Sequence, residues 1–145
     1  RTITVGRLDY NTEGLLLLST NGDFARHLEL PSNKWNRQYR ARVFGHVDMD
    51  RLKKLVNGIR IDGVKYGSIK VEMDMARDSN SWLTITMQEG KNREIRKVME
   101  YFGLKVNRLI RTSFGPFSLG QMSVGTIKEV PRAVLKKNFG EDFRF

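Results

Sequence analysis

Residues 6–21 constrain the fold more than any other part of the sequence, because they set ionisable side chains in a tight turn next to an apolar run. The run, residues 15–18, is four leucines bounded by Gly14 and by Asn21-Gly22, which predicts a short buried strand. The polar residues at 11–13 can bond nearby backbone amides and fix a compact loop after Asp9. Asp9 is therefore expected to project from a rigid frame, although Asp9 and Thr12 also fit a simple turn or cap.

Composition indicates the class of partner. The formal net charge of +10 favours a polyanion, and nucleic acid fits better than a membrane because no apolar run approaches the length of a spanning helix. A basic protein without such a partner is the alternative. Cysteine is absent, which excludes disulfides, thiolate nucleophiles and cysteine-based zinc sites and suits a cytoplasmic location. His27 and His46 lack the spacing of metal ligands, so no metal is expected.

Periodicity and turn residues predict the remaining elements. We expect helices at 21–30, 50–57, 92–102 and 131–137, the third capped by Asn92, and strands at 2–5, 35–45, 59–63, 68–75, 81–89, 104–112, 117–119 and 126–130. In the strand at 35–45, Tyr39, Ala41 and Val43 should face a core while Gln38, Arg40 and Arg42 face outward. Residues 138–145 are expected to be a tail. No repeat or linker divides the chain, so its 145 residues predict one α+β domain with a mostly antiparallel sheet and few helices.

Several segments resemble the bacterial ribosomal RNA pseudouridine synthases of the RsuA/RluB/RluE/RluF family. Residues 6–17 match the family's Gly-Arg-Leu-Asp-x-x-Thr-x-Gly-Leu-Leu-Leu pattern at every fixed position. Residues 37–43 resemble its Lys-x-Tyr strand, with Arg37 in place of lysine. Residues 90–97 resemble Gly-x-Asn-Arg-x-Val/Ile-Arg-Arg, with Lys97 in place of the last arginine, and residues 109–119 resemble Leu-x-Arg-x-x-x-Gly-x-x-x-Leu.

The resemblance implies a mixed, mostly antiparallel central sheet with a cleft whose floor carries Asp9 as the catalytic aspartate. An ionised carboxylate in a dry pocket needs a cation, and the matching motif assigns Arg96 as that partner. Tyr39 would stack on the flipped uracil and relay a proton, which makes it the third catalytic candidate. Leu109 would wall the pocket, Arg7 would enter the space left by the flipped nucleotide, and further substrate contacts are expected from Thr12, Asn92 and Arg93.

The basic residues near these motifs are expected to hold RNA phosphates: Arg37, Arg40, Arg42, Lys91, Lys97, Arg108 and Arg111. The implied reaction is isomerisation of a uridine in ribosomal RNA by a monomer without cofactor or membrane partner. The motifs are most similar to the large-subunit (23S) RluB type, with the small-subunit (16S) RsuA type as the alternative. Such enzymes carry an N-terminal S4-like RNA-binding domain and a first strand, both of which we expect to be missing from residues 1–145.

Two other functional classes fit parts of the sequence. A catalytically silent RNA-binding or ribosome-assembly module would account for the charge and for the mixture of basic and aromatic residues. A hydrolase could use Asp9 and Glu13 as a carboxylate pair. The hydrolase leaves Tyr39 and the basic residues unexplained, and the silent module leaves the motif around Asp9 unexplained.

Overall fold

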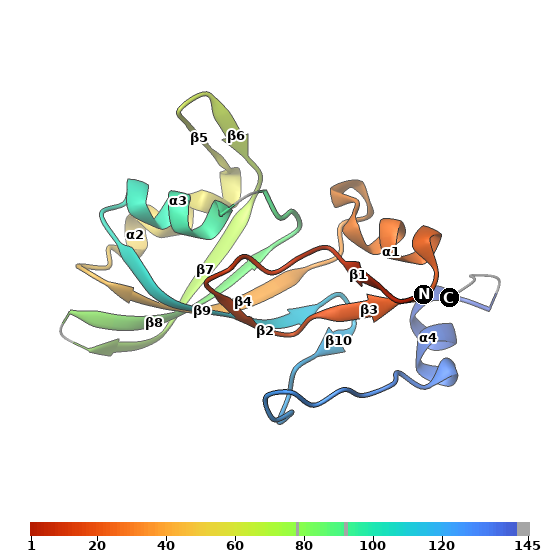
Figure 1. Cartoon of the computed structure of the whole chain (residues 1–145). Helices are drawn as coiled ribbons and strands as arrows, with labels where there is room; N and C mark the ends of the chain where they lie inside the picture. Colours follow the sequence, from red (N-terminus) through yellow and green to blue (C-terminus); the bar gives the residue numbers. More distant parts are fainter. Residues whose placement is uncertain (78, 92, 142–145) are drawn as a thin grey trace.

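The computed structural model describes residues 1–77, 79–91 and 93–141, and Figure 1 shows their arrangement. The predicted cap Asn92, Asp78 in the predicted hairpin turn and residues 142–145 of the predicted tail lie outside the described residues. The described elements follow one another along the chain as β1 (Ile3–Val5), β2 (Thr12–Gly14), β3 (Leu17–Ser19), α1 (Gly22–Glu29), η1 (Pro31–Asn33), β4 (Arg37–Phe44), α2 (Met49–Leu52), η2 (Lys53–Asn57), β5 (Ile59–Ile61), β6 (Val64–Tyr66), β7 (Ile69–Arg77), β8 (Asn80–Met87), α3 (Glu94–Tyr101), β9 (Lys105–Phe114), β10 (Phe117–Ser118) and α4 (Arg132–Phe139).

The main sheet has the order β10-β9-β4-β8-β7, and these neighbours pair antiparallel. The short strand β2 adds a parallel pairing to β9 that brings Thr12 opposite Leu109. The sheet is therefore mixed and mostly antiparallel, as the sequence predicted. The parallel pairing matters for the site, because it fixes the loop that carries Asp9 against the middle of β9.

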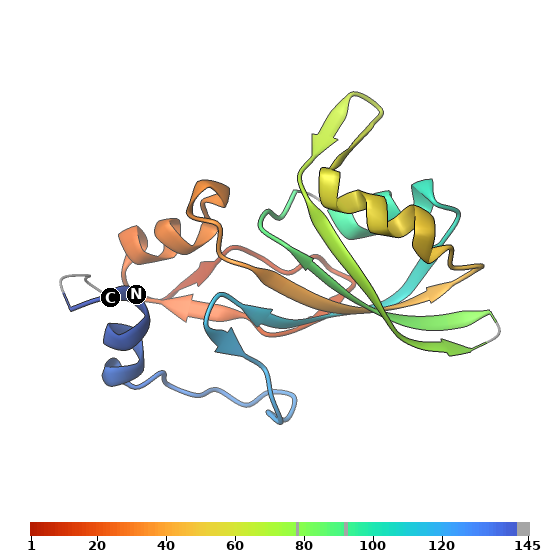
Figure 2. The same ribbon diagram turned by 180° about the vertical axis from the view of Figure 1, so that it is seen from behind.

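Strand β4 alternates as predicted. Tyr39, Ala41 and Val43 are buried, whereas Gln38, Arg40 and Arg42 are only partly covered. The buried face packs against α2 and α3, which lie over the same face of the sheet in Figures 1 and 2. From α3, Ile95, Val98 and Met99 enter this core, so the helical stripe read from the sequence is confirmed.

A second, smaller core lies at the other end of the molecule, where α1 and α4 approach each other (Figure 1). The Phe24 ring of α1 meets the Phe139 ring of α4 edge to face, with 4.9 Å between centroids. The predicted helix at 131–137 therefore extends two residues further, and Phe139, expected in a tail, packs against this core. Helix α1 itself is confirmed, and its predicted first residue Asn21 caps it by accepting the backbone N–H groups of residues 23 and 24.

Three other predictions change. The four leucines do not form one buried strand: Leu15 is buried, but Leu16 and Leu18 are 41% and 51% exposed, because β3 pairs only with β1 in a two-stranded ribbon. The strand predicted at 126–130 is not formed, because this segment has no sheet partner among the described residues. The predicted helix at 50–57 is a short α-helix followed by a 3₁₀ turn, and β6 was missed.

Candidate active site

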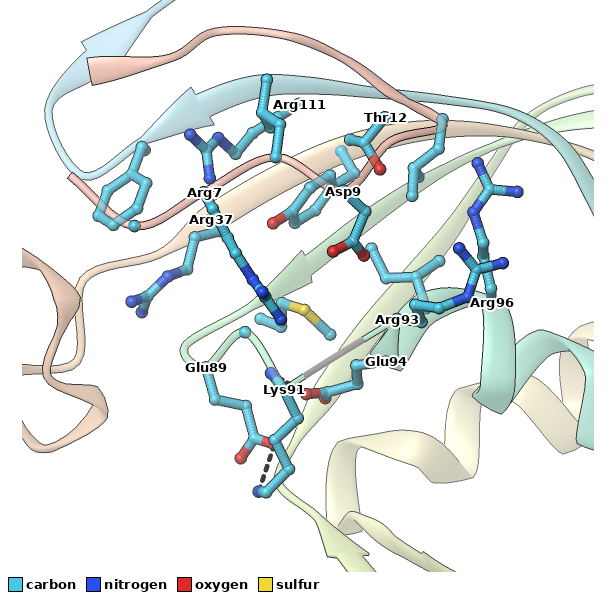
Figure 3. Close-up of a pocket in the computed structure, with 18 of the residues that line it drawn as sticks. Arg7, Asp9, Thr12, Arg37, Glu89, Lys91, Arg93, Glu94, Arg96 and Arg111 are labelled. Atoms are coloured by element: carbon cyan, nitrogen blue, oxygen red, sulfur yellow. Dashed lines mark hydrogen bonds and ion pairs between the residues drawn. The ribbon is translucent and has the colours of Figure 1, made fainter. Parts of the chain in front are cut away.

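A pocket of about 370 Å³ opens where the loop before β2, the strands β4 and β9 and the start of α3 meet. Figure 3 shows the Asp9 carboxylate projecting into it, with Arg93 and Arg96 on the α3 side. The sequence-predicted site residues that line this pocket are Arg7, Asp9, Thr12, Arg37, Tyr39, Lys91, Arg93, Arg96, Leu109 and Arg111. Segments up to about one hundred positions apart in the sequence thus converge on one cavity.

The loop that carries Asp9 is braced on both sides. The Thr12 backbone N–H donates to the Asp9 carbonyl at 2.9 Å and closes a turn, and Thr12 then begins β2 beside β9. Gly14, at a φ of +107°, ends β2 where a Cβ would collide with the backbone oxygen of Arg111. Gly14 therefore allows the end of β2 to lie close to the backbone of β9, which holds the Asp9 loop in position. The predicted rigid frame for Asp9 is present.

Arg96 reaches this loop, but not by the expected direct ion pair with Asp9. Its guanidinium donates to the carbonyl of Val106 in β9 at 2.9 Å and to the carbonyl of Asn11 at 2.7 Å. Among the described residues no Asp9–Arg96 ion pair is formed. Burial, together with Arg93, lowers the pKa of Arg96, and the charge of Asp9 opposes that lowering, so the two groups interact through space. Arg96 ties α3 to the loop that carries Asp9 while its charge faces Asp9.

Tyr39 and Arg111 form the inner part of the pocket. Both are buried, and Arg111 donates from Nε to the carbonyl of Leu15 at 2.9 Å. Its Nη2 is buried without a hydrogen-bond partner among the described residues. Burial lowers the pKa of Arg111, and the nearby Tyr39 opposes this. Arg111 was expected to hold RNA phosphates at the surface, but it is an internal cation of the pocket, because β9 turns it to the Tyr39 face.

Arg37 was also expected at the surface and is buried. Its guanidinium donates to four backbone carbonyls, those of Trp35 (3.1 Å), Gln88 (2.7 Å), Leu28 (3.4 Å) and Glu29 (2.9 Å). Burial lowers its pKa. Arg37 therefore joins α1 to the β4–β8 pair, and its hydrogen-bonding groups are used within the fold and not on phosphates. A lysine could not form the same fork of bonds.

Two carboxylates on the α3 side of the pocket were not predicted. Glu94 is 3% exposed, and its Oε1 accepts the Lys91 backbone N–H at 3.1 Å. Its burial, with a hydrogen bond to the side chain of Glu89, raises the pKa of Glu94 to about 8. Partial burial acts to raise the pKa of Glu89. The Lys91 ammonium, 2.7 Å away, and Glu94 outweigh that effect, so the pKa of Glu89 is lowered. At neutral pH Glu94 is thus largely protonated, with Lys91 paired to Glu89 in front of it.

Three other predicted phosphate contacts, Arg40, Arg42 and Lys97, do not line the pocket. Arg40 and Arg42 point away from the Tyr39 face, where Arg40 pairs with Asp74 at 3.3 Å and Arg42 donates to the Asn107 side chain at 2.6 Å. Both guanidinium groups lie over the Trp82 ring, at 4.6 and 5.8 Å from its centroid. Lys97 is exposed on α3 and lines neither this pocket nor the concavity beside it.

The carboxylate pair needed for a hydrolase is not assembled. Glu13 pairs with both Nε and Nη2 of Arg108 at 3.1 Å. It lines a neighbouring concavity and not the pocket that contains Asp9. The hydrolase interpretation is therefore wrong for this pair, because residue 13 lies in β2, after the turn, while Asp9 begins the turn.

Among residues 1–77, 79–91 and 93–141, no group of three or more His, Cys, Asp or Glu side chains could hold a metal ion. The part of the chain that the structure describes contains no helix of the length and apolar character needed to span a membrane.

Comparison with known proteins identifies the family. A sequence model described as RNA pseudouridylate synthase matches residues 1–101. An uncharacterised RNA pseudouridine synthase of Rickettsia typhi is 44% identical over 137 residues, which are 94% of this chain. The chain belongs to the RNA pseudouridylate synthase family. The matched residues 1–101 include Asp9, Tyr39 and Arg96 of the pocket.

Other relatives agree with this family. Ribosomal large subunit pseudouridine synthase B of Yersinia pestis is 40% identical over 119 residues, 82% of this chain. A crystal structure of a pseudouridylate synthase matches the fold with a TM-score of 0.82, over 94% of this chain and 59% of that one, at 23% identity. The chain spans 56% of the Rickettsia typhi relative and 37% of the Yersinia pestis relative. The pseudouridine synthase fold predicted from the motifs is confirmed.

Sequence reasoning overlooked Glu94 as a site residue and assigned Arg111 to the wrong environment. Glu94 directly precedes Ile95 at the start of the apolar stripe of α3, and an acidic residue in the first turn of a helix is usually a solvated partner of the helix dipole. Polar and apolar residues do not alternate regularly along β9, so the pattern alone does not show which face of the sheet Arg111 takes. Only the pairing of β9 with β2 and β4 determines which of these residues face the cavity.

Proposed function

We propose that this chain catalyses the isomerisation of a uridine to pseudouridine in ribosomal RNA. The observation that carries the proposal is one pocket holding the Asp9 carboxylate, the Tyr39 ring and a set of internal cations. Its volume of about 370 Å³ is within the range of about 300–1,000 Å³ typical of small-molecule sites. A single flipped nucleoside is a ligand of that size.

The chemistry assigned to the pocket needs one carboxylate. In the reaction the bond between uracil N1 and ribose C1′ breaks, the base turns, a bond forms between C5 and C1′, and the proton of C5 is lost while N1 gains one. Asp9 starts it either by attacking C1′ or by removing a ribose proton on the way to a glycal. Both routes need an ionised, oriented carboxylate shielded from water, and the Asp9–Thr12 turn supports the orientation.

The remaining pocket residues have complementary roles in this proposal. Tyr39 stacks on the uracil and relays the proton leaving C5, and Leu109 closes the pocket behind the base. The buried guanidinium of Arg111 lies beside Tyr39 and adds positive charge to the pocket wall. The positive charge of Arg96 faces Asp9 and its guanidinium holds the Asp9 loop, while Thr12 supports the turn.

Binding of the RNA strand involves the exposed residues at the pocket mouth. Arg7, Lys91 and Arg93 line the pocket from outside and are assigned to the sugar and phosphates of the target nucleotide, together with Lys97 and Arg108 nearby. Asn92 remains a substrate contact in the proposal on the strength of its motif. The similarity to large-subunit synthase B favours 23S over 16S ribosomal RNA as the substrate.

The test is tritium release from ribosomal RNA labelled at uracil C5, using 23S and 16S RNA separately. We expect release from 23S RNA by the wild-type protein and at least a 10³-fold lower rate for Asp9→Asn, roughly the loss produced by removing an essential catalytic group. RNA affinity should stay within a few-fold, because it rests on many phosphate contacts. Asp50→Asn, an exposed carboxylate on α2, is the matched control and should retain full activity.

Three results would contradict this proposal. Undiminished release by Asp9→Asn would remove the carboxylate mechanism. Release from 16S RNA alone would assign the chain to the small subunit. If the wild-type protein binds both RNAs and releases no tritium from either, the chain is the silent RNA-binding module.

A further inference from the structure

A second concavity, of about 1,010 Å³, adjoins the pocket on its α3 side. Arg93 and Arg96 line both hollows and so lie between them. Asp9 lines only the pocket, and Tyr10, the next residue, lines only the second concavity. One dipeptide thus contributes a carboxylate to one hollow and an aromatic ring to the other.

Tyr10 is the most accessible large apolar side chain near the site. It is 100% exposed and makes no ring, ion-pair or hydrogen-bond contact among the described residues. Its backbone, in contrast, is held firmly. Tyr10 lies within the turn closed by the Thr12 N–H and the Asp9 carbonyl, and the carbonyl of the following Asn11 accepts the Arg96 guanidinium at 2.7 Å. Because the turn is braced, little backbone freedom is lost when a flat ligand stacks on the ring.

The other groups in the second concavity suit a nucleotide. Arg93, Arg96 and Lys105 supply positive charge, and Asn11 adds a polar side chain. Glu100 and Glu13 are also present, and the charge of Glu13 is offset by Arg108. Cations beside an aromatic platform are the usual means of holding a single nucleic acid strand, with phosphate on the cations and a base on the ring.

We propose that the second concavity binds the nucleotide next to the target uridine, with its base stacked on Tyr10 and the connecting phosphate held by Arg93. This subsite rests on the proposed function, because it assumes that uridine enters the Asp9 pocket. Among the described residues that line the second concavity, Tyr10 is the one aromatic side chain, so we expect it to contact one of the two neighbours of the uridine. Stacking accepts any base but requires that a base be present, since every base has a π-face.

The experiment compares RNA heptamers with a single central uridine and either a complete neighbour or an abasic site immediately before or after it. Affinity is measured by fluorescence anisotropy in an Asp9→Asn background, where no product accumulates. The protein with Tyr10 intact should bind the RNA abasic at one of the two positions about tenfold more weakly, and the RNA abasic at the other almost normally. Tyr10→Ala should bind all three RNAs equally, and Tyr10→Trp should keep the discrimination.

Tyr101→Ala is the matched control, because Tyr101 is a 55% exposed tyrosine on α3 that lines neither hollow. Tyr101→Ala should show the same loss of affinity for the same abasic RNA as the protein with both tyrosines. Abasic penalties that are equal with and without the Tyr10→Ala substitution would overturn the subsite, even if the protein forms pseudouridine. A Tyr10-dependent penalty in a protein that releases no tritium would instead retain the subsite and remove the proposed function, so the two failures are distinguishable.

Discussion

The two faces of β4 give arginine two different roles within six residues. On the pocket face, Arg37 is 5% exposed and donates to four carbonyls. On the opposite face, Arg40 and Arg42 lie over Trp82 with single polar partners at the surface. Position along the strand, and not residue type, decides whether an arginine is part of the fold or a surface charge.

This difference also separates structure from RNA binding. A buried guanidinium whose donors are satisfied cannot turn to a phosphate without leaving several carbonyls unpaired. A surface guanidinium can, but it must lie on the side where the RNA runs. The basic stretch at 37–42, which the sequence suggests is one RNA-binding run, therefore consists of an internal brace and two charges remote from the pocket.

The largest effect on the pocket face is expected at Arg96. Arg96→Met removes the cation facing Asp9 and the two bonds that tie α3 and β9 to its loop. We expect kcat to fall about 10²- to 10³-fold, as for loss of one preorganised electrostatic group, with RNA affinity changed by only a few-fold. Single-turnover kinetics with labelled ribosomal RNA give both quantities. Lys97→Met, an exposed neighbour on the same helix, should keep its kcat; unchanged turnover and weak binding in Arg96→Met would make Arg96 a phosphate contact.

Arg37→Met should have the largest effect on stability. It leaves four carbonyls from three segments without their donor, and we expect a loss of about 2–4 kcal/mol in the free energy of unfolding. Urea denaturation followed by circular dichroism measures it. The matched substitution Arg40→Met, on the other face of the same strand, should cost less than about 1 kcal/mol, because exposed ion pairs contribute little. Equal losses of unfolding free energy in Arg37→Met and Arg40→Met would mean that the hydrogen bonds of Arg37 contribute no more to stability than the surface ion pair of Arg40.

The sequence predicted those features that depend on local pattern. The alternation of Tyr39, Ala41 and Val43, the Asn21 cap of α1 and the stripe of α3 all follow from neighbours within a few positions. The Asp9 motif was likewise recognisable, and the cavity in which Asp9 lies with Tyr39 and Arg96 agrees with the expected cleft. Their assigned roles stay predictions.

Features that depend on pairing between distant segments were not predictable. Residues 126–130 alternate well enough to suggest a strand but lack a sheet partner in the described part of the chain. The leucine run is uniformly apolar, yet β3 has a neighbour on one side only, so Leu16 and Leu18 remain at the surface. Arg37 and Arg111 face inward because the register of β4 with β8 and β9 turns them there.

Glu94 extends the comparison to buried carboxyl groups on the pocket side. Its pKa is raised by burial to about 8 in the folded protein, from an ordinary value of 4.5. The folded state therefore holds a proton that the unfolded chain releases above about pH 4.5. Its stabilising contribution is complete below pH 4.5 and is lost as the pH rises through about 8.

Glu94→Gln removes this titration and keeps a similar shape. We expect the variant to gain stability relative to the wild type as pH rises from 5 to 9, by up to roughly 4 kcal/mol over that interval. Thermal or urea unfolding at several pH values measures the difference. Glu72→Gln, an exposed carboxylate on β7, should give a difference that changes little with pH. A pH-independent difference for Glu94→Gln would mean that Glu94 is ionised in the fold.

The smallest effect is expected on the face away from the pocket. If RNA contacts are confined to the pocket side, Arg40→Ala and Arg42→Ala should each change RNA affinity less than about twofold and leave the salt dependence of binding unaltered. Arg93→Ala, at the pocket mouth, should in contrast lower the slope of log affinity against log salt by about 0.7–0.9, the value for one lost phosphate contact. Filter binding at several salt concentrations measures these slopes. A slope change for Arg40→Ala as large as that for Arg93→Ala would mean that the strand passes over both faces of the sheet, with the Trp82 ring and its two arginines as part of the path.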